Sequence, residues 1–495
     1  MDVRPSVARG LSTNRYRRDA CEYRDVDRSV LTRTVRGLWD DDILPSLSDL
    51  VAVPAISPAF DPAWAEHGHL AAAIEHVRGW LAGRDLPGAT IEVVELPERT
   101  PLLVVDVPAT GDATDTVLLY GHLDKQPPVA NWSEGLGPWT PVVRDGRLYG
   151  RGAADDGYSG YAAIGAIEAV RAAGGAHARC VVLLETGEES GSPDLPAYLE
   201  HLKPALGEVS LVVCLDSGGS DYDRMWLTTS LRGLAQATLT VRVLESGLHS
   251  GMASGIVPSS FRVARQLLDR LEDSATGEVL IREMHVEVPA NRVAEVREAI
   301  ASAPGVQVSS VPWAPGVRPV TTDEVELGLN AGWRPTLSIT GADGLPAPED
   351  AGNVLRPFTT LVLSFRLPPT ADAKASVEAV ERLLTQDVPY GAVVELSRVE
   401  HADGWNAPEL APWLRKTLDV VGEEVFDAPW RTVSLGGSIP FMGLLHDAYP
   451  DAQFLVTGAV GPDSNCHVPD EWLHLGHAAR ITEAVAVVLD AHTRR

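Results

Sequence analysis

The chain contains 495 residues, of which 45% are hydrophobic and 22% are charged, and its formal net charge at pH 7 is −27. This length predicts at least two domains, and the composition is typical of a soluble globular protein. The negative charge argues against nucleic acid and anionic membranes as partners. No apolar run approaches the ~18 residues of a membrane-spanning helix.

Residues 1–30 are rich in arginine but also contain acidic residues, and they lack the apolar segment of a secretion signal. We therefore expect either a disordered tail there or an upstream start codon that was wrongly chosen. The cysteines are scattered without the spacing of a zinc ribbon, and two of them lie inside apolar runs, which predicts buried, reduced thiols and a cytoplasmic location. These cysteines are Cys21, Cys180, Cys214 and Cys466.

Two patterns of apolar residues alternate along the first half of the chain. Apolar residues three to four positions apart predict helices, and short continuous apolar runs predict buried strands. This alternation indicates an α/β domain with a mostly parallel sheet and helices on both faces, which we assign to residues 31–230. The helices are predicted at 30–50, 70–84 and 157–173, and the strands at 91–96, 102–107, 117–121, 180–184 and 211–215.

The pattern changes at about residue 231. Two successive α-plus-β halves predict a four-stranded sheet with helices on one face, a ferredoxin-like α+β domain inserted at 231–397. The chain then returns to the first domain over 398–495. In the insertion, strands are predicted at 235–243, 335–340, 358–367 and 392–399, and helices at 257–271, 293–301 and 371–384. After it follow helices at 411–421 and 478–492 and a strand at 453–456.

Histidines and carboxylates follow the predicted strands of the large sheet and the glycine-rich turn at 150–152. A single histidine after a strand is more often packed or exposed than a metal ligand, so the prediction depends on their co-occurrence. Together they form a set suited to two hydrolytic metal ions. The residues are His122, Asp124, Asp155, Asp156, Glu188, Glu189, Asp216 and His467.

These residues lie in stretches that resemble the M20 family of dinuclear zinc aminoacylases and peptidases, and within it the carnosinase-like dipeptidases. The resemblance extends from about residue 35 to the C-terminus. The matching stretches are G-H-L-D-K-Q-P (121–127), L-Y-G-R-G-A-A-D-D (148–156), E-T-G-E-E-S-G-S (185–192), C-L-D-S-G (214–218), L-H-S-G (248–251), G-G-S-I-P (436–440) and C-H-V-P-D-E (466–471).

The resemblance implies a ligand set for two Zn²⁺ ions per subunit, although Mn²⁺ or Co²⁺ would also accept these donors. Asp155 would bridge the two ions through its two carboxylate oxygens. His122 and Asp216 would complete one site. Glu189 and His467 would complete the other.

The resemblance also implies roles beside the ligands. Glu188 would be the general base that takes a proton from metal-bound water, so that hydroxide attacks at neutral pH. The alternative reading of Glu188 is an exposed acid at a turn. Asp124 would orient His122. A cis peptide bond is expected between Asp155 and Asp156.

The inserted domain is expected to mediate a homodimer, in which His249 reaches the partner's active site and stabilises the oxyanion. Arg366 would pair with a substrate carboxylate through its bidentate fork, and Asn353 would make an adjacent polar contact. Gly437 and Ser438 would offer a backbone N–H and a hydroxyl to the same carboxylate. For His249 and Arg366, a purely structural or surface role remains the alternative.

These residues predict a metal-dependent dipeptidase that cleaves a peptide bond next to a free C-terminal carboxylate. An N-acyl-amino-acid deacylase or a carboxypeptidase of the same superfamily is the alternative, as is a catalytically inactive homologue. Leu435 and Asp470 depart from the residues common at their positions in the family, and both departures leave the substrate open. The presence of Glu188 and His249 argues against an inactive homologue, because a binding protein needs neither a base nor an oxyanion donor.

Overall fold

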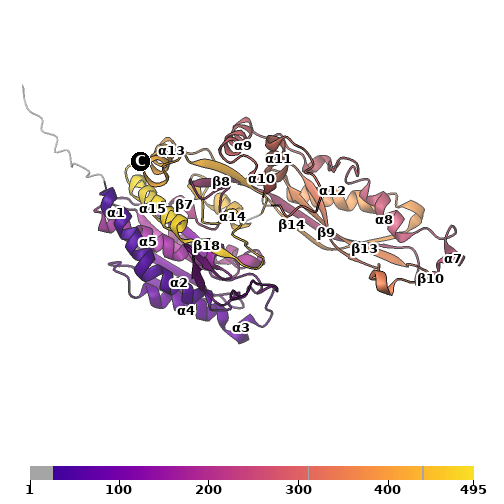
Figure 1. The fold of residues 1–495 in the computed structure, drawn as a ribbon, viewed down its shortest axis with the longest axis horizontal. Helices are drawn as coiled ribbons and strands as arrows, with labels where there is room; N and C mark the ends of the chain where they lie inside the picture. Colours follow the sequence, from indigo (N-terminus) through magenta and orange to yellow (C-terminus); the bar gives the residue numbers. More distant parts are fainter. Residues whose placement is uncertain (1–25, 310, 438–439) are drawn as a thin grey trace, which may run out of the picture.

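The computed structural model describes residues 26–309, 311–437 and 440–495, with the side chain of residue 440 left out. Figure 1 shows a rounded body and an elongated one. Helices α1, α5 and α15 lie on the rounded body, and the elongated body ends at β10 and α7. None of the helices in these ranges combines the length and the apolar character that a membrane crossing requires.

The rounded body is built on a six-stranded sheet in the order β1-β2-β6-β3-β7-β17. The four strands from β6 to β17 are parallel, and β2 and β1 extend the sheet as antiparallel strands. Every residue of β3 is buried, as expected for a central strand with an apolar sequence. The strands are β1 (Thr90–Val94), β2 (Leu102–Val107), β3 (Thr116–His122), β6 (Arg179–Glu185), β7 (Val209–Cys214) and β17 (Gln453–Val456).

Helices cover both faces of this sheet, which confirms the predicted α/β architecture. On one face, alternate residues of the strands pack against the larger group of helices. On the other face they pack against α6 and α14. The larger group is α1 (Arg28–Leu38), α2 (Leu44–Val51), α4 (His69–Leu81), α5 (Ser159–Ala172), α13 (Pro412–Val421) and α15 (Leu475–His492); the opposite pair is α6 (Leu195–Leu206) and α14 (Pro440–Ala448).

Helix α1 begins at Arg28, so the last part of the segment expected to be a tail, 1–30, is in fact ordered. Asp27 caps the helix, because its carboxylate accepts the backbone N–H groups of Ser29 and Val30 at 3.0 and 3.1 Å. Val26 is buried. The remainder of the expected tail, 1–25, lies outside the described residues.

The elongated body contains a second sheet in the order β11-β13-β9-β14, with all neighbours antiparallel. Helices α8 and α12 pack on one face of it. This β-α-β-β-α-β arrangement confirms the predicted ferredoxin-like insertion. Its elements are β9 (Gly233–Arg242), α8 (Ser260–Leu268), β11 (Thr336–Asp343), β13 (Phe358–Leu367), α12 (Ala373–Thr385) and β14 (Val393–Ala402).

The insertion ends later than the expected boundary at residue 397. Strand β14 continues past a register shift after Ser397, and Ala402 still pairs with Leu234 of β9. The irregularity is a bulge, which interrupts the alternation of side chains without ending the strand. The inserted sheet therefore extends to Ala402.

Short elements connect the two bodies and form their edges. Helices α9 and α11 pack on a three-stranded sheet in the order β15-β8-β16. The connecting elements are β8 (Trp226–Leu231), α9 (Ala290–Ser302), α10 (Val306–Ser309), α11 (Glu324–Gly332), β15 (Trp405–Asn406) and β16 (Arg431–Leu435). The others are α3 (Trp64–His67), β4 (Val142–Arg144), β5 (Arg147–Tyr149), β10 (Leu248–His249), α7 (Ser250–Ala253), β12 (Val354–Leu355) and β18 (Trp472–His474).

Candidate metal centre

The predicted ligands meet at the carboxyl edge of the large sheet. Strand β3 lies between β6 and β7 and runs parallel to both. It ends at His122, which pairs with Glu185 at the end of β6. Residues that follow parallel strands leave the sheet at the same edge, where α/β proteins bind their ligands. Glu188, Glu189 and Asp216 reach the centre in this way.

Asp155 lies between two imidazoles. Its Oδ1 is 3.2 Å from Nε2 of His122, and its Oδ2 is 2.8 Å from Nε2 of His467. One carboxylate thus presents each of its oxygens to a different histidine, as a bridging ligand requires. The peptide bond between Asp155 and Asp156 is cis, which confirms that expectation.

The other predicted residues approach the same two histidines. Oδ2 of Asp216 and Oε2 of Glu188 each lie 3.9 Å from Nε2 of His122. Oε2 of Glu189 lies 3.5 Å from Nε2 of His467. The structure therefore brings together all five residues expected to bind metal, with the expected base beside them.

These donors fit a metal ion. Ligand atoms of His122, Asp155 and Glu189 lie within 4.8 Å of one another, and so do those of His122, Asp156 and Asp216. Asp156 was not predicted as a ligand, although the acidic pair in the sequence was a signal for it. Its Oδ1 is buried and has no hydrogen-bond partner among the described residues. A carboxylate oxygen left unpaired in the interior is costly without a cation.

The carboxylates of the centre repel one another. Burial and the charge of Asp216 raise the pKa of Glu188 well above its usual range. Burial and the charge of Asp155 raise the pKa of Glu189 to about 8, and burial raises the pKa of Asp216 to about 6. Divalent cations would offset this repulsion, because they favour the ionised carboxylates. The raised pKa values are therefore those expected of carboxylates placed to bind divalent cations.

Asp124 is fully buried and connects two parts of the centre. Its carboxylate accepts the backbone N–H groups of Glu188 and Glu189 at 3.1 and 3.0 Å. Its backbone oxygen lies 3.0 Å from Nδ1 of His122, and its Oδ1 lies 3.5 Å from the same atom. Asp124 therefore positions the turn that carries the expected base, in addition to the imidazole that it was expected to orient.

A buried ion pair supports the turn that carries Asp155. Arg151 and Glu471 are both about 1% exposed, and Nη1 of Arg151 lies 2.6 Å from Oε2 of Glu471. The other oxygen of Glu471 accepts the backbone N–H groups of Gly152 and Ala154 at 2.9 and 3.2 Å. Nη2 of Arg151 donates to the carbonyl oxygen of Val468, next to His467. No sequence pattern predicts this network, because Arg151 and Glu471 are 320 positions apart.

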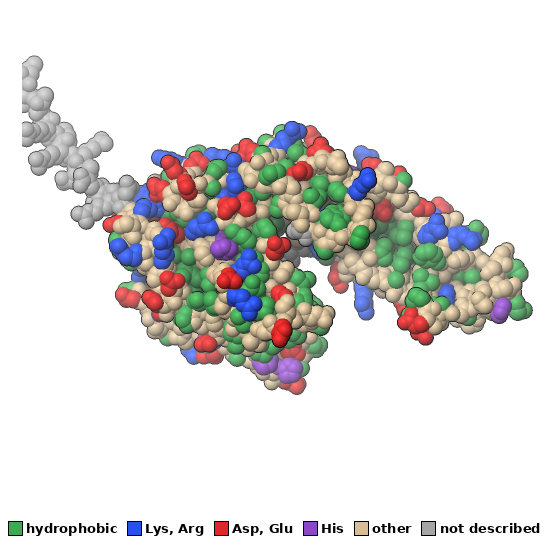
Figure 2. Space-filling model, in the orientation of Figure 1, with side chains coloured by type: hydrophobic (Ala, Val, Ile, Leu, Met, Phe, Trp, Pro, Cys, Tyr) green, Lys and Arg blue, Asp and Glu red, His purple; other side chains and the backbone are tan. Residues whose placement is uncertain are grey.

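The centre opens into a cavity of about 580 Å³ lined by Asp155, Glu188, Glu189, Asp216 and His467. Figure 2 shows the notch between the two bodies of the molecule. Three lining residues with polar side chains were not predicted as site residues: Gln126, Glu400 and His401. Nε2 of Gln126 donates to Oε2 of Glu189 at 2.6 Å, and its place in the 121–127 stretch was a signal. No sequence pattern indicated Glu400 or His401, because both residues follow the bulge of β14.

Of the residues expected to bind a carboxylate, Gly437 lines a second cavity beside the metal centre. Gly436 and Gly437 line an adjoining cavity of about 460 Å³ together with Asp155, Asp216 and His467. Arg366 lies on β13 opposite Leu234, which lines the first cavity. Ser438 lies outside the described residues.

His249 and Asn353 are not brought to the centre within one chain. The backbone N–H of Ser250 donates to the carbonyl oxygen of Asn353 at 2.8 Å, so the two segments lie together. Figure 1 shows β10, which contains His249, at the far end of the elongated body. The side chains of His249 and Asn353 are exposed there. The structure therefore separates both residues from the metal centre of their own chain.

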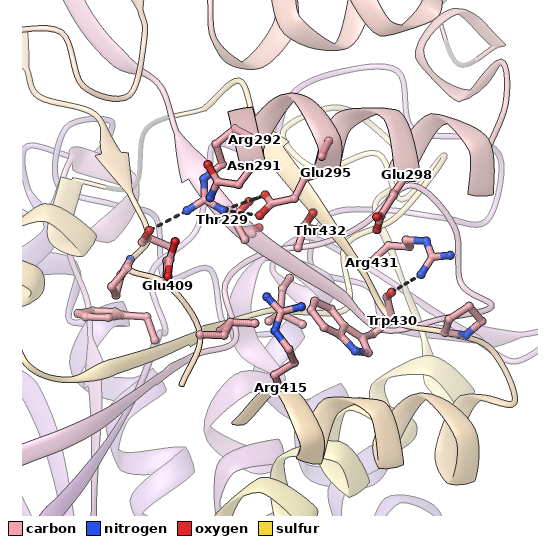
Figure 3. Close-up of a pocket in the computed structure, with 18 of the residues that line it drawn as sticks. Thr229, Asn291, Arg292, Glu295, Glu298, Glu409, Arg415, Trp430, Arg431 and Thr432 are labelled. Carbon is pink, nitrogen blue, oxygen red and sulfur yellow. Dashed lines mark hydrogen bonds and ion pairs between the residues drawn. The ribbon is translucent and has the colours of Figure 1, made fainter. Parts of the chain in front are cut away.

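Figure 3 shows another cavity, of about 540 Å³, between helices α9 and α13. Arg292 lines this cavity. Its guanidinium group donates hydrogen bonds to the carboxylate of Glu295, to the side-chain oxygen of Asn406 and to the carbonyl oxygen of Ala407. Within the described ranges, the groups of side chains that are spaced to bind a metal all lie at the sheet edge instead.

Comparison with known proteins agrees with this geometry. A sequence model of peptidase family M20/M25/M40 matches residues 118–491. A cysteinylglycine-S-conjugate dipeptidase of Corynebacterium striatum is 29% identical over 367 residues, which cover 73% of this chain and 77% of that protein. A Cys-Gly metallodipeptidase of Schizosaccharomyces pombe is 25% identical over 408 residues, which cover 80% of this chain and 82% of that protein.

The fold is also found among solved structures. The crystal structure of human carnosine dipeptidase 1 superposes with a TM-score of 0.71 at 21% identity, covering 94% of this chain and all of that one. The family match begins inside β3 and ends in α15, so it contains the whole candidate centre. It confirms the resemblance noted in the motifs. The chain therefore belongs to peptidase family M20/M25/M40 and is a metal-dependent peptidase.

Proposed function

We propose that this protein is a dipeptidase with two divalent metal ions, in the first place Zn²⁺. The observation that carries the proposal is the placement of Asp155, whose two oxygens face His122 and His467 separately. His122, Asp155 and Asp216 would hold one ion. Asp155, Glu189 and His467 would hold the other. When bound, the ions supply Lewis acidity and lower the pKa of water.

Dipeptides are the proposed substrates. Two relatives are named for the hydrolysis of dipeptides that end in glycine, which supports a small substrate with a free C-terminal carboxylate. Gly437 lines the smaller cavity, and Arg366 pairs with Leu234, which lines the larger one; both residues are proposed to bind this carboxylate. A panel of dipeptides and N-acyl amino acids tests the proposal. Faster hydrolysis of N-acyl amino acids would favour the deacylase instead.

Glu188 is proposed to act as the general base. It lines the cavity beside ligand Glu189, and its backbone is anchored to Asp124, so its carboxylate is directed toward the space where substrate binds. It would accept a proton from the attacking water and transfer it to the leaving amine. Arg366 and Gly437 would orient the peptide so that its carbonyl carbon lies near this water.

A homodimer is proposed because the residues around His249 are apolar and exposed. Met252 is 78% exposed and Ile256 is 81% exposed, and both lie at the same tip as β10 and α7. Exposed apolar side chains that cluster in this way are typical of a protein interface. Docking of this tip on a second subunit would carry His249 to the partner's centre, where it would stabilise the oxyanion.

Removal of metal is expected to abolish hydrolysis. Dialysis against a chelator should reduce dipeptide turnover to background, because the carboxylates of the centre would then repel one another and the substrate carbonyl would lack Lewis-acid polarisation. Adding back Zn²⁺, Mn²⁺ or Co²⁺ separately, with metal content measured alongside activity, identifies the preferred ion and the number bound. Full activity in protein shown to contain no metal would contradict the proposal.

Mixed dimers are expected to recover activity that each parent variant lacks. His249→Ala removes the oxyanion donor and Glu188→Gln removes the base, so both homodimers should be inactive. A heterodimer contains one complete centre. Random exchange of equal amounts should restore about a quarter of the original activity, since half of the dimers would have one working site. If native mass spectrometry shows that the subunits have exchanged but turnover does not recover, action of His249 on the partner's centre is excluded.

A further inference from the structure

Arg232 lies at the junction of the two bodies, as the single residue between β8 and β9. Its Nε contacts the catalytic domain, at 3.4 Å from the carbonyl oxygen of Gly436. Its Nη1 contacts the inserted domain, at 3.4 Å from both the carbonyl oxygen of Asn330 and Oγ1 of Thr336. The guanidinium is therefore placed where the two domains meet.

These contacts leave the positive charge of Arg232 without a counter-ion. All three acceptors are neutral, and the distances are longer than ordinary N–H···O hydrogen bonds. Burial and the positive charge of nearby Arg366 lower the pKa of Arg232 to about 10, and no carboxylate of the described chain opposes this effect. Buried charges in proteins are normally paired. Among the described residues, neither Arg232 nor the nearby Arg366 has an ion-pair partner.

The unpaired charge lies against the wall of the substrate cavity. Nη2 of Arg232 would be 3.2 Å from a Cβ built on Gly436, so the guanidinium packs directly on this turn. Gly436 lines the cavity of about 460 Å³ that also contains Asp155 and His467. Only the Gly436 turn thus separates the guanidinium of Arg232 from the cavity that Asp155 and His467 also line.

We propose that Arg232 binds the terminal carboxylate of the substrate together with Arg366. This inference rests on the proposed dipeptidase function and deepens it. A carboxylate between two guanidinium groups cancels their mutual repulsion and accepts the bidentate hydrogen bonds that arginine forms best. Arg232 would then select substrates with a free C-terminus. It also makes the subsite dependent on the junction of the two domains.

Binding and turnover of matched ligands test the role of Arg232. Binding of Ala-Gly, Ala-Gly amide and N-acetylglycine to the metal-loaded Glu188→Gln protein is measured by calorimetry, with and without Arg232→Met. We expect Arg232→Met to weaken binding of the two carboxylate ligands by roughly 10- to 100-fold and binding of the amide by less than about 3-fold. In protein with Glu188 intact, KM for Ala-Gly should rise while kcat changes little.

Two further variants separate binding from structure. Arg232→Lys retains the charge and should recover part of the lost affinity. Arg334→Met is a matched control, because Arg334 also lies beside Asn330 but is already paired with Glu326. Equal weakening of binding for Ala-Gly and Ala-Gly amide would overturn the assignment. If the protein hydrolyses N-acetylglycine but not Ala-Gly, the proposed dipeptidase function is wrong. Calorimetry would still measure how Arg232→Met changes the affinity for the carboxylate ligands, so the two proposals fail separately.

Discussion

Replacing Glu188 with glutamine is expected to lower kcat for a dipeptide by roughly 10²- to 10⁴-fold, the usual contribution of a general base. The substitution keeps the shape of the side chain and the backbone N–H that donates to Asp124. Glutamine cannot accept a proton from water, so only the chemical step should slow. Steady-state kinetics on the metal-loaded variant measure the effect, and elemental analysis of the same sample measures its metal content.

Glu400→Gln provides the control for the base variant. Glu400 lines the same cavity but is exposed at the end of β14, away from the ligand pairs. Its replacement should change kcat by less than about 3-fold, which corresponds to under ~1 kcal/mol in the barrier. Retention of full activity by Glu188→Gln, with its metal ions still bound, would show that another group takes the proton.

Breaking the buried ion pair is expected to be the most destabilising single change near the centre. Arg151→Met leaves Glu471 uncompensated in an interior site, and loss of one partner of a buried pair costs about 3–5 kcal/mol. Burial already raises the pKa of Glu471 to about 7, so the acid has little stabilisation without Arg151. Urea denaturation of the metal-free protein measures the loss, and metal titration should show weaker binding because the Asp155 turn is no longer anchored.

An exposed ion pair of the same length is the control. Arg78 and Glu75 also approach to 2.6 Å, but their side chains are 51% and 55% exposed. Arg78→Met should cost less than about 1 kcal/mol, because water solvates both charges when the pair is broken. Similar destabilisation by Arg78→Met and Arg151→Met would mean that burial does not set the strength of the Arg151–Glu471 pair.

The general architecture was predictable because it depends on patterns that are local in the sequence. Apolar runs such as 117–121 are long enough to identify buried strands, and helical spacing identifies the helices between them. Polar residues that follow such strands must leave a parallel sheet at one edge. His122, Glu189 and Asp216 were found on this basis. His467 was included because it occurs together with these residues, and the family resemblance assigned it to the second ion.

Other features required the tertiary structure, because they depend on residues that are distant in the chain. The bulge after Ser397 extends β14 to Ala402 through pairing with β9, and pairing is a property of two strands. The ion pair of Arg151 with Glu471 joins segments 320 positions apart. The unpaired charge of Arg232 is visible only when its neutral acceptors and Arg366 are known.

The sequence by itself determined the fold class, the family and the identity of the candidate ligands, because periodicity and short motifs encode them locally. The resemblance implied that Asp155 bridges two ions, and the tertiary structure supplied the distances from its two oxygens to His122 and His467. The tertiary structure also decided that His249 lies far from its own chain's centre (Figure 1). Distances between side chains arise from long-range packing, which balances contributions from the whole chain and which no local pattern records.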